Sequence, residues 1–222
     1  MRTIYIRHAD KDFNNGNSEY FKHDPGITET GVDRAKNIGM KLIKLYGEPT
    51  KIISSPYRRA RETSLIMNNV LKNPLDEIVI ETDISEYLGN HNDVPLDVTI
   101  ATKIHCPPHP ETFEHMKKRV KKYLEKNNKK EGIVWVITHG LIIKQIALSY
   151  KIKTSKQLPY LTSFSVVEHK DLIRAEFILF RNFLKNEEVE NKPIYKVKKP
   201  FIERFLISPE NTGRDDMSGR IN

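Results

Sequence analysis

Two histidines in this sequence each follow directly on a short apolar segment rich in β-branched residues. His8 comes after the run at residues 3–6 and is preceded by Arg7, and His139 comes after residues 133–138. Such segments are typical of buried strands, and open α/β sheets bind their ligands at the carboxyl ends of their strands. A guanidinium can bind two phosphate oxygens at once, and a neutral imidazole can attack an electrophile. One such histidine is more often structural, whereas two at one sheet edge indicate an anion site.

A cluster of arginines at the start of a predicted helix is a further candidate for this site. Arg58, Arg59 and Arg61 lie in the block at residues 55–63, which follows the apolar segment 51–54. The N-terminus of a helix carries free backbone N–H groups, so arginines in its first turn strengthen an existing anion site. The alternative is that they only solvate the helix end, and we expect this of at least one of them.

Glu86 and Gly140 complete the set of residues whose types suit a chemical role. Glu86 lies in a predicted loop after the apolar segment 78–81, where its carboxyl group could protonate a leaving oxygen. Gly140 follows His139 and would allow a ligand to approach the backbone closely. His139 itself could donate to a phosphate oxygen and stabilise charge during transfer. A structural role is the common alternative for each of these residues taken alone.

The elements that would position these residues alternate between strands and helices. Strands are predicted at residues 3–7, 51–54, 78–81 and 133–138. Apolar residues at helical spacing lie between them, and the first helix is expected to begin after Thr28 and end at Gly47. This alternation predicts an α/β fold, a three-layer sandwich whose mostly parallel central sheet has helices on both faces.

The C-terminal part of the chain has a different pattern. Residues 163–169 and 173–180 alternate as an antiparallel hairpin does, and we expect this hairpin at the edge of the sheet. Beyond it the sequence is charged and irregular. We therefore expect one domain over residues 1–182 and a charged, partly disordered extension over 183–222.

Composition limits the compartment and the partners. The 222 residues contain no stretch of about 18 apolar residues, the length a membrane span needs. The first strand begins at residue 3, which leaves no room for a signal peptide, and the single cysteine excludes an intrachain disulfide. We therefore expect a cytoplasmic protein that contacts no membrane. The sequence leaves open whether the protein forms a homodimer.

The net charge of +8 suits an anionic partner such as a phosphorylated metabolite, a phosphoprotein or a nucleic acid. Nucleic acid is the weakest of these, because no basic segment carries the interleaved aromatic residues of a single-strand binder. Much of the excess charge lies at residues 116–130, where we interpret it as the solvated face of a helix.

A metal site is an alternative for the irregular segment at residues 90–110. His105, Cys106 and His109 lie close in sequence, but the two prolines between them break any helix that could align them. No fourth ligand is evident, so we expect no metal and no cofactor. This segment and residues 15–22 are instead the expected sources of substrate selectivity.

Taken in order, these motifs resemble those of the histidine phosphatase superfamily, also called the phosphoglycerate mutase-like family. The matching blocks are Arg7-His8-Ala9-Asp10 with Asn14 beyond them, Ile27-Thr28-Glu29-Thr30-Gly31, Ser55 to Thr63, Glu86, and His139-Gly140. The family's Ser-Pro-x-x-Arg-Ala-x-x-Thr pattern singles out Arg59 among the three arginines. The ordered set is far more specific than any single block.

The resemblance implies a phosphatase that cleaves phosphate monoesters without a metal. By it, His8 is the nucleophile that takes the phosphoryl group as phosphohistidine, and Glu86 protonates the leaving alcohol and later activates water. The residues implied to hold the phosphoryl oxygens are Arg7, Arg59, His139 and Asn14. The implied substrate is a small-molecule phosphate ester or a phosphoprotein.

Two other functions are compatible with the same fold. The first is a cofactor-dependent phosphoglycerate mutase, but residues 89–93 lack the aromatic-Gly-x-x-Glu-Gly stretch usual in the family's mutases. The second is a non-catalytic binding or scaffold protein. A decayed enzyme would be expected to have lost part of its catalytic set, and the four residues most diagnostic of it are all present: Arg7, His8, Arg59 and His139. Ala9 and Ile27, where the family usually has Gly and Leu, are minor departures.

Overall fold

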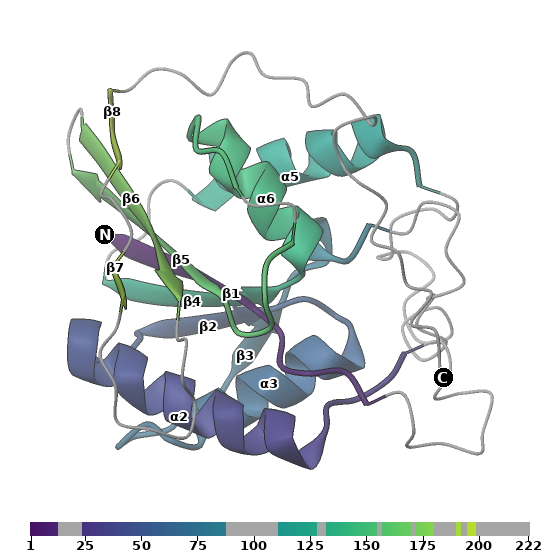
Figure 1. The fold of residues 1–222 in the computed structure, drawn as a ribbon, viewed down its shortest axis with the longest axis vertical. Coiled ribbons are helices and arrows are strands. Elements are labelled where there is room, and N and C mark those ends of the chain that lie inside the picture. Colours follow the sequence, from purple (N-terminus) through teal and green to yellow (C-terminus); the bar gives the residue numbers. More distant parts are fainter. Residues whose placement is uncertain are drawn as a thin grey trace.

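The strands form one mixed sheet in the computed structural model, which describes residues 1–12, 24–87, 111–127, 132–154, 157–169, 172–179, 190–191 and 195–198 (Figure 1). The strands are β1 (Arg2–Arg7), β2 (Lys51–Ser54), β3 (Ile78–Ile80), β4 (Ile133–Thr138), β5 (Ser163–His169), β6 (Leu172–Leu179), β7 (Glu190–Asn191) and β8 (Tyr195–Lys198). Their order is β3-β2-β4-β1-β5-β6-β7, with β8 also paired to β6. The strands β3, β2, β4 and β1 are parallel, and the remaining pairings are antiparallel.

Helices cover both faces of this sheet (Figure 1). They are α2 (Glu29–Tyr46), α3 (Arg58–Asn68), α5 (Phe113–Asn127) and α6 (Gly140–Ser149), with a short 3₁₀ helix η1 (Thr82–Ile84) after β3. One buried apolar cluster joins α2 and α3 to the sheet, and a second joins α5 and α6 to its other face. The three-layer α/β fold expected from the sequence is therefore confirmed. Among the described residues, no helix is both long and apolar enough to cross a membrane.

Strand β4 lies inside the sheet and is buried on both faces. Val134 and Val136 belong to the cluster under α5 and α6, whereas Trp135 and Ile137 belong to the cluster under α2 and α3. A strand enclosed in this way has no polar face, which explains its uninterrupted apolar sequence. Its strong signal is why this element could be predicted with its observed bounds.

Helix α2 begins and ends where its capping residues predict. The hydroxyl of Thr28 accepts a hydrogen bond from the backbone N–H of Gly31 at 2.9 Å, as an N-cap should. Gly47 follows the helix with a φ of 91°, which is unfavourable for a residue with a Cβ. The helix is therefore held between two local sequence signals.

The structure adds to the predicted sheet at its C-terminal side. Strands β7 and β8, which lie in the segment expected to be a charged extension, pair antiparallel with β6. The outer strand of the predicted hairpin thus has further strands beside it. At the other edge, β3 ends at Ile80, one residue before the predicted end. Glu81 instead caps η1 by accepting a hydrogen bond from the N–H of Asp83 at 3.1 Å.

Parallel pairing brings the ends of three strands to one edge of the sheet. Arg7 on β1 is in register with Thr138 on β4, and Ser54 on β2 is in register with Ile137. The three strands end at Arg7, Ser54 and Thr138. The next residues, which include His8 and His139, therefore emerge side by side.

Candidate active site

His8 is a buried imidazole whose orientation is fixed by the backbone. Its Nδ1 lies 2.7 Å from the carbonyl oxygen of Ala9. A carbonyl can only accept a hydrogen bond, so Nδ1 carries the proton and Nε2 keeps its lone pair. The N–H of Ala9 in turn donates to the hydroxyl of Thr63 at 3.0 Å, and that hydroxyl donates to the carbonyl of Arg59 at 2.7 Å. The ring is therefore presented in the tautomer that a nucleophile requires.

The surroundings of His8 keep its ring neutral. The side chain is 1% exposed, and burial lowers its pKa well below the usual 6.5. The positive charge of Arg59, the His139 ring and the charge of Arg7 lower this pKa further. Because a protonated imidazole has no lone pair to offer, these surroundings favour the form of the ring that keeps its lone pair.

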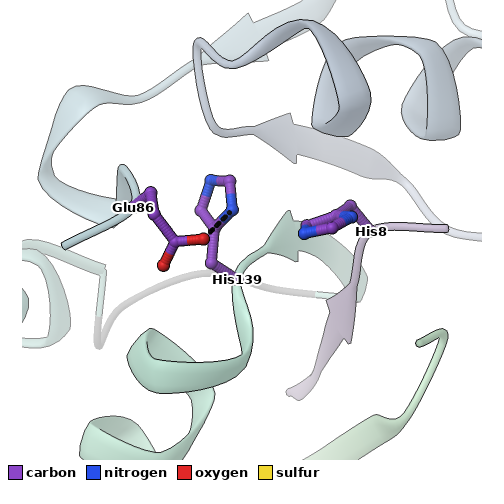
Figure 2. Close-up of side chains that lie close together, drawn as sticks. All are labelled: His8, Glu86 and His139. Carbon is purple, nitrogen blue, oxygen red and sulfur yellow. Dashed lines mark ion pairs between the residues drawn. The ribbon is translucent and has the colours of Figure 1, made fainter. Parts of the chain in front are cut away.

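His139 lies between Glu86 and His8 at the end of β4 (Figure 2). Its Nδ1 is 3.1 Å from Oε2 of Glu86, which is within the distance of an ion pair. Its Nε2 is 2.7 Å from Oγ of Ser55. The ring centroids of His8 and His139 are 5.2 Å apart. Burial lowers the pKa of His139 to about 4, although the Glu86 carboxylate acts in the opposite direction.

Arg59 is a fully buried cation held between carboxylates. One guanidinium nitrogen lies 3.3 Å from Oε2 of Glu86, and the other lies 3.5 Å from Oδ1 of Asp24. Asp24 also accepts from the backbone N–H of Arg58 at the start of α3, at 3.0 and 2.9 Å. Arg58 itself turns away to pair with Glu62 at 2.6 Å. Of the two adjacent arginines, only Arg59 contacts the Glu86 carboxylate within the described residues.

Arg7 supplies a second guanidinium beside His8. It donates to the carbonyl of Leu158 and lies over the ring of Tyr160, 4.3 Å from the ring centroid. Among the described residues, its buried Nε has no hydrogen-bond partner. A Cβ at Gly140 would lie 3.4 Å from this Nε, which is an ordinary van der Waals distance, so the start of α6 lies beside the guanidinium. A buried N–H without a partner is costly, and an oxyanion would satisfy it.

Glu86 is ionised in the free site. Burial raises its pKa, but His139, Arg59 and Lys11 together outweigh burial and hold it well below its usual range. Because His139 is itself largely neutral at pH 7, we attribute the persistence of the carboxylate to the permanent charge of Arg59. The site therefore holds a carboxylate, two neutral imidazoles and two guanidinium groups.

His8, Glu86 and His139 are residue types that can also bind a metal ion. One ligand atom each from His8, Glu86 and His139 lie within 4.8 Å of one another. Arg59, however, lies against the same carboxylate, and the charge of Arg7 acts on His8. Fixed cations repel a metal ion and attract an anion. The donor set therefore fits a phosphoryl group better than a divalent metal.

The described residues contain all the predicted site residues except one. His8, His139, Arg59, Arg7 and Glu86 gather at one edge of the sheet. Asn14 lies outside the described residues, as do residues 15–22, 90–110, and the histidines and cysteine of the alternative metal site.

Two further site residues, Ser55 and Tyr160, have no role in the sequence-based prediction. Ser55 holds Nε2 of His139, and it follows β2 as the two histidines follow β1 and β4, so its position was a usable signal. Tyr160 covers Arg7 and lies 5.6 Å from the His8 ring. It belongs to an irregular turn where Leu161 has a φ of 58°, and no periodic pattern indicates it.

We expect the acid sensitivity of the fold to depend partly on His8. Its pKa is lower in the folded than in the unfolded chain, so below about pH 6.5 the unfolded chain binds more protons and gains stability relative to the native state. His8→Asn keeps an N–H donor for the Ala9 carbonyl but cannot titrate. Between about pH 7 and about pH 5, the unfolding temperature of this variant should fall less than that of the wild type. Parallel pH profiles would contradict a buried neutral His8.

The amino-acid sequence matches the histidine phosphatase superfamily (branch 1) over residues 3–172. No curated protein matches it. Among solved structures, a mycobacterial glucosyl-3-phosphoglycerate phosphatase complexed with VO3 is 20% identical, with a TM-score of 0.56 over 79% of this chain and 96% of that one.

Two other solved structures have a comparable likeness. Ecdysone phosphate phosphatase from Bombix mori, in complex with tungstate, is 15% identical, with a TM-score of 0.57 over 75% of this chain and 89% of that one. Phosphoglycerate mutase from Bacillus anthracis is 20% identical, with a TM-score of 0.55 over 74% of this chain and 87% of that one. At such identities these structures show a common fold. Because the family match covers more than half of the sequence, the chain belongs to the histidine phosphatase superfamily.

Proposed function

We propose that this protein is a hydrolase, a phosphomonoesterase that cleaves phosphate monoesters through a phosphohistidine on His8. The observation that carries the proposal is the state of the His8 ring. Its Nδ1 proton is engaged by the Ala9 carbonyl, its Nε2 lone pair is retained, and its pKa is lowered by burial and by neighbouring cations. A neutral, fixed imidazole beside two guanidinium groups suits nucleophilic attack on phosphorus.

In the first step, Nε2 of His8 attacks phosphorus and the bond from phosphorus to the ester oxygen breaks. The guanidinium groups of Arg7 and Arg59 neutralise the phosphoryl oxygens, and His139 can donate a further hydrogen bond. The departing alkoxide takes a proton from Glu86. These charges would stabilise the transition state in place, without a metal.

Glu86 must hold a proton for this step, although it is ionised in the free site. A bound phosphoryl group would bring negative charge next to the carboxylate and would compete for Arg59. Both effects raise the pKa of a carboxyl group. Substrate binding would therefore convert Glu86 from an ion-pair partner into a general acid.

In the second step, Glu86 removes a proton from a water molecule that attacks the phosphohistidine. The bond from phosphorus to nitrogen breaks, its electron pair returns to Nε2, and inorganic phosphate leaves. Imidazole is a good leaving group as well as a nucleophile, which is why dividing hydrolysis into two transfers is favourable.

Likeness to other members of the superfamily supports the proposal. The mycobacterial phosphatase was solved with VO3 and the Bombix mori phosphatase with tungstate, which are both phosphate-like oxyanions. The cationic site of this chain would suit the same class of ligand. The substrate proposed here is a small-molecule phosphate ester or a phosphoprotein.

Phosphate release from a panel of esters tests this function. We expect the wild type to liberate inorganic phosphate from an aryl phosphate and from at least one of a set of sugar phosphates, nucleotides and phosphopeptides. Added EDTA should not abolish the release, because Arg7 and Arg59 supply the positive charge.

The same assay separates the competing functions. Interconversion of 2- and 3-phosphoglycerate without net phosphate release would indicate a mutase instead. A folded wild-type protein that hydrolyses none of the esters would indicate a binding protein.

A further inference from the structure

The guanidinium group of Arg119, on α5, is bound to the loop that carries Glu86. It donates to the backbone carbonyls of Asp83 and Ser85, each at 2.9 Å, and to that of Glu86 at 3.0 Å. Its remaining donors face Glu111, whose carboxylate it pairs with at 2.6 and 2.9 Å. The Glu111 side chain is 1% exposed and that of Arg119 is 10% exposed. The planar guanidinium of Arg119 is therefore almost fully buried, and the buried Glu111 carboxylate balances its charge.

Arg119 and one residue of β4 together fix the backbone of this loop. The carbonyl of Ile84, the one position from 83 to 86 that Arg119 does not reach, accepts from the hydroxyl of Thr138 at 2.6 Å. Thr138 directly precedes His139, so the loop is tied to the strand that delivers this histidine. Each carbonyl of the loop consequently has a donor, and the Glu86 side chain starts from a fixed backbone position.

The same guanidinium connects the two ends of a long segment. The chain enters residues 88–110 after Tyr87 and returns from them at Glu111. Arg119 binds the Glu86 carbonyl on one side and the Glu111 carboxylate on the other. The rings of Tyr87 and Phe113 add an edge-to-face contact across the same gap, with centroids 5.7 Å apart. Contacts among the described residues therefore hold both ends of this segment beside α5.

We propose that Arg119, held by Glu111, is a positioning residue for the general acid. This inference rests on the proposed function, because it assigns Arg119 a role only through Glu86. Among the described residues, Arg119 contacts neither His8 nor the guanidinium groups of Arg7 and Arg59. Its effect should therefore grow with the need of the leaving group for a proton, while His8 and the groups that hold the phosphoryl oxygens stay unchanged.

The test is the substitution Arg119→Lys, with kcat/KM, which reports the first transfer alone, measured on two substrates. Lysine keeps the charge for Glu111 but cannot donate to three carbonyls in one plane. We expect kcat/KM for an alkyl phosphate, which needs the acid, to fall by about tenfold to a hundredfold, as a misplacement near 1 Å can cause. The kcat/KM for 4-nitrophenyl phosphate, whose leaving group needs little protonation, should change little.

A double-mutant comparison identifies the residue through which Arg119 acts. In a Glu86→Gln background the acid is already absent, so Arg119→Lys should cause no further loss on the alkyl phosphate. Glu111→Gln, which removes the charge partner but keeps its shape, should show the same substrate-dependent loss to a smaller degree.

Lys122→Ala is the matched control on the same helix. Lys122 reaches the same loop through the Asp83 carboxylate at 3.6 Å, but its side chain is 73% exposed, so both substrates should be turned over as by the wild type. Equal losses on both substrates, or an undiminished loss in the Glu86→Gln background, would overturn the positioning role while the wild type remained a phosphatase. A wild type that hydrolyses neither ester would instead contradict the proposed function itself, and the inference with it.

Discussion

His8→Ala should abolish phosphate release, with a loss on the order of 10⁴-fold or more. The substitution removes the only side chain proposed to bond to phosphorus, and none of its neighbours within the described residues occupies the same place. Arg7, Arg59 and His139 would still bind the phosphoryl group. We therefore expect the fall to appear in kcat, with a much smaller change in the affinity for vanadate or phosphate. Initial rates and a competitive binding measurement check the two parts separately.

The variant should remain folded. The ring is buried and neutral, so its removal costs a hydrogen bond and some packing but leaves no buried charge without its partner. A thermal melt shows whether this balance holds. His115→Ala is the matched control, because His115 is an exposed histidine at the start of α5 and should be replaceable without loss of activity. Substantial turnover by folded His8→Ala would require a different nucleophile.

The loss of activity caused by Glu86→Gln should depend on the leaving group of the substrate. Glutamine keeps the size of the side chain but has no proton to give at any useful pH, so an alkyl phosphate should lose on the order of 10²- to 10⁴-fold in kcat. Nitrophenolate is a stable anion and leaves without help, so 4-nitrophenyl phosphate should lose far less in the first transfer. A plot of log kcat/KM against the pKa of the leaving alcohol should be steeper for the variant than for the wild type.

The second transfer gives Glu86→Gln another signature. If water activation also depends on Glu86, phosphoenzyme formed rapidly from the aryl phosphate should accumulate, and a burst of nitrophenolate should precede slow turnover. Glu125→Gln provides the control, because Glu125 is an exposed glutamate on α5 paired only with Lys121 in the described structure. Equal losses of kcat/KM for alkyl and aryl esters would remove Glu86 from the acid role.

The central part of the fold could be predicted because its sequence signals are local. Strands β1 and β4 are enclosed on both faces and appear as continuous apolar runs, and α2 is delimited by Thr28 and Gly47. Strands β7 and β8 could not be predicted in the same way. They are short, lie in a charged and irregular stretch, and depend on pairing with β6.

The site residues likewise differ in whether a local sequence signal indicates them. His8, Arg59 and His139 could be predicted together because each directly follows a strand or opens a helix at one sheet edge. Tyr160 and Arg119 could not, because each acts through a contact between segments far apart in the chain. In the sequence, Arg119 is one basic residue among the lysines of α5, and only its orientation towards the Glu86 loop distinguishes it.

Trapping the phosphoenzyme tests the nucleophilic role of His8 most directly. The protein would be mixed with a labelled phosphate ester, quenched in alkali within the first turnover, and digested for mass spectrometry. We predict one phosphoryl group on the peptide that contains His8, stable in alkali and lost in acid, and absent from His8→Ala. A label that persists in His8→Ala, or an acid-stable phosphate on Ser55, would contradict the mechanism.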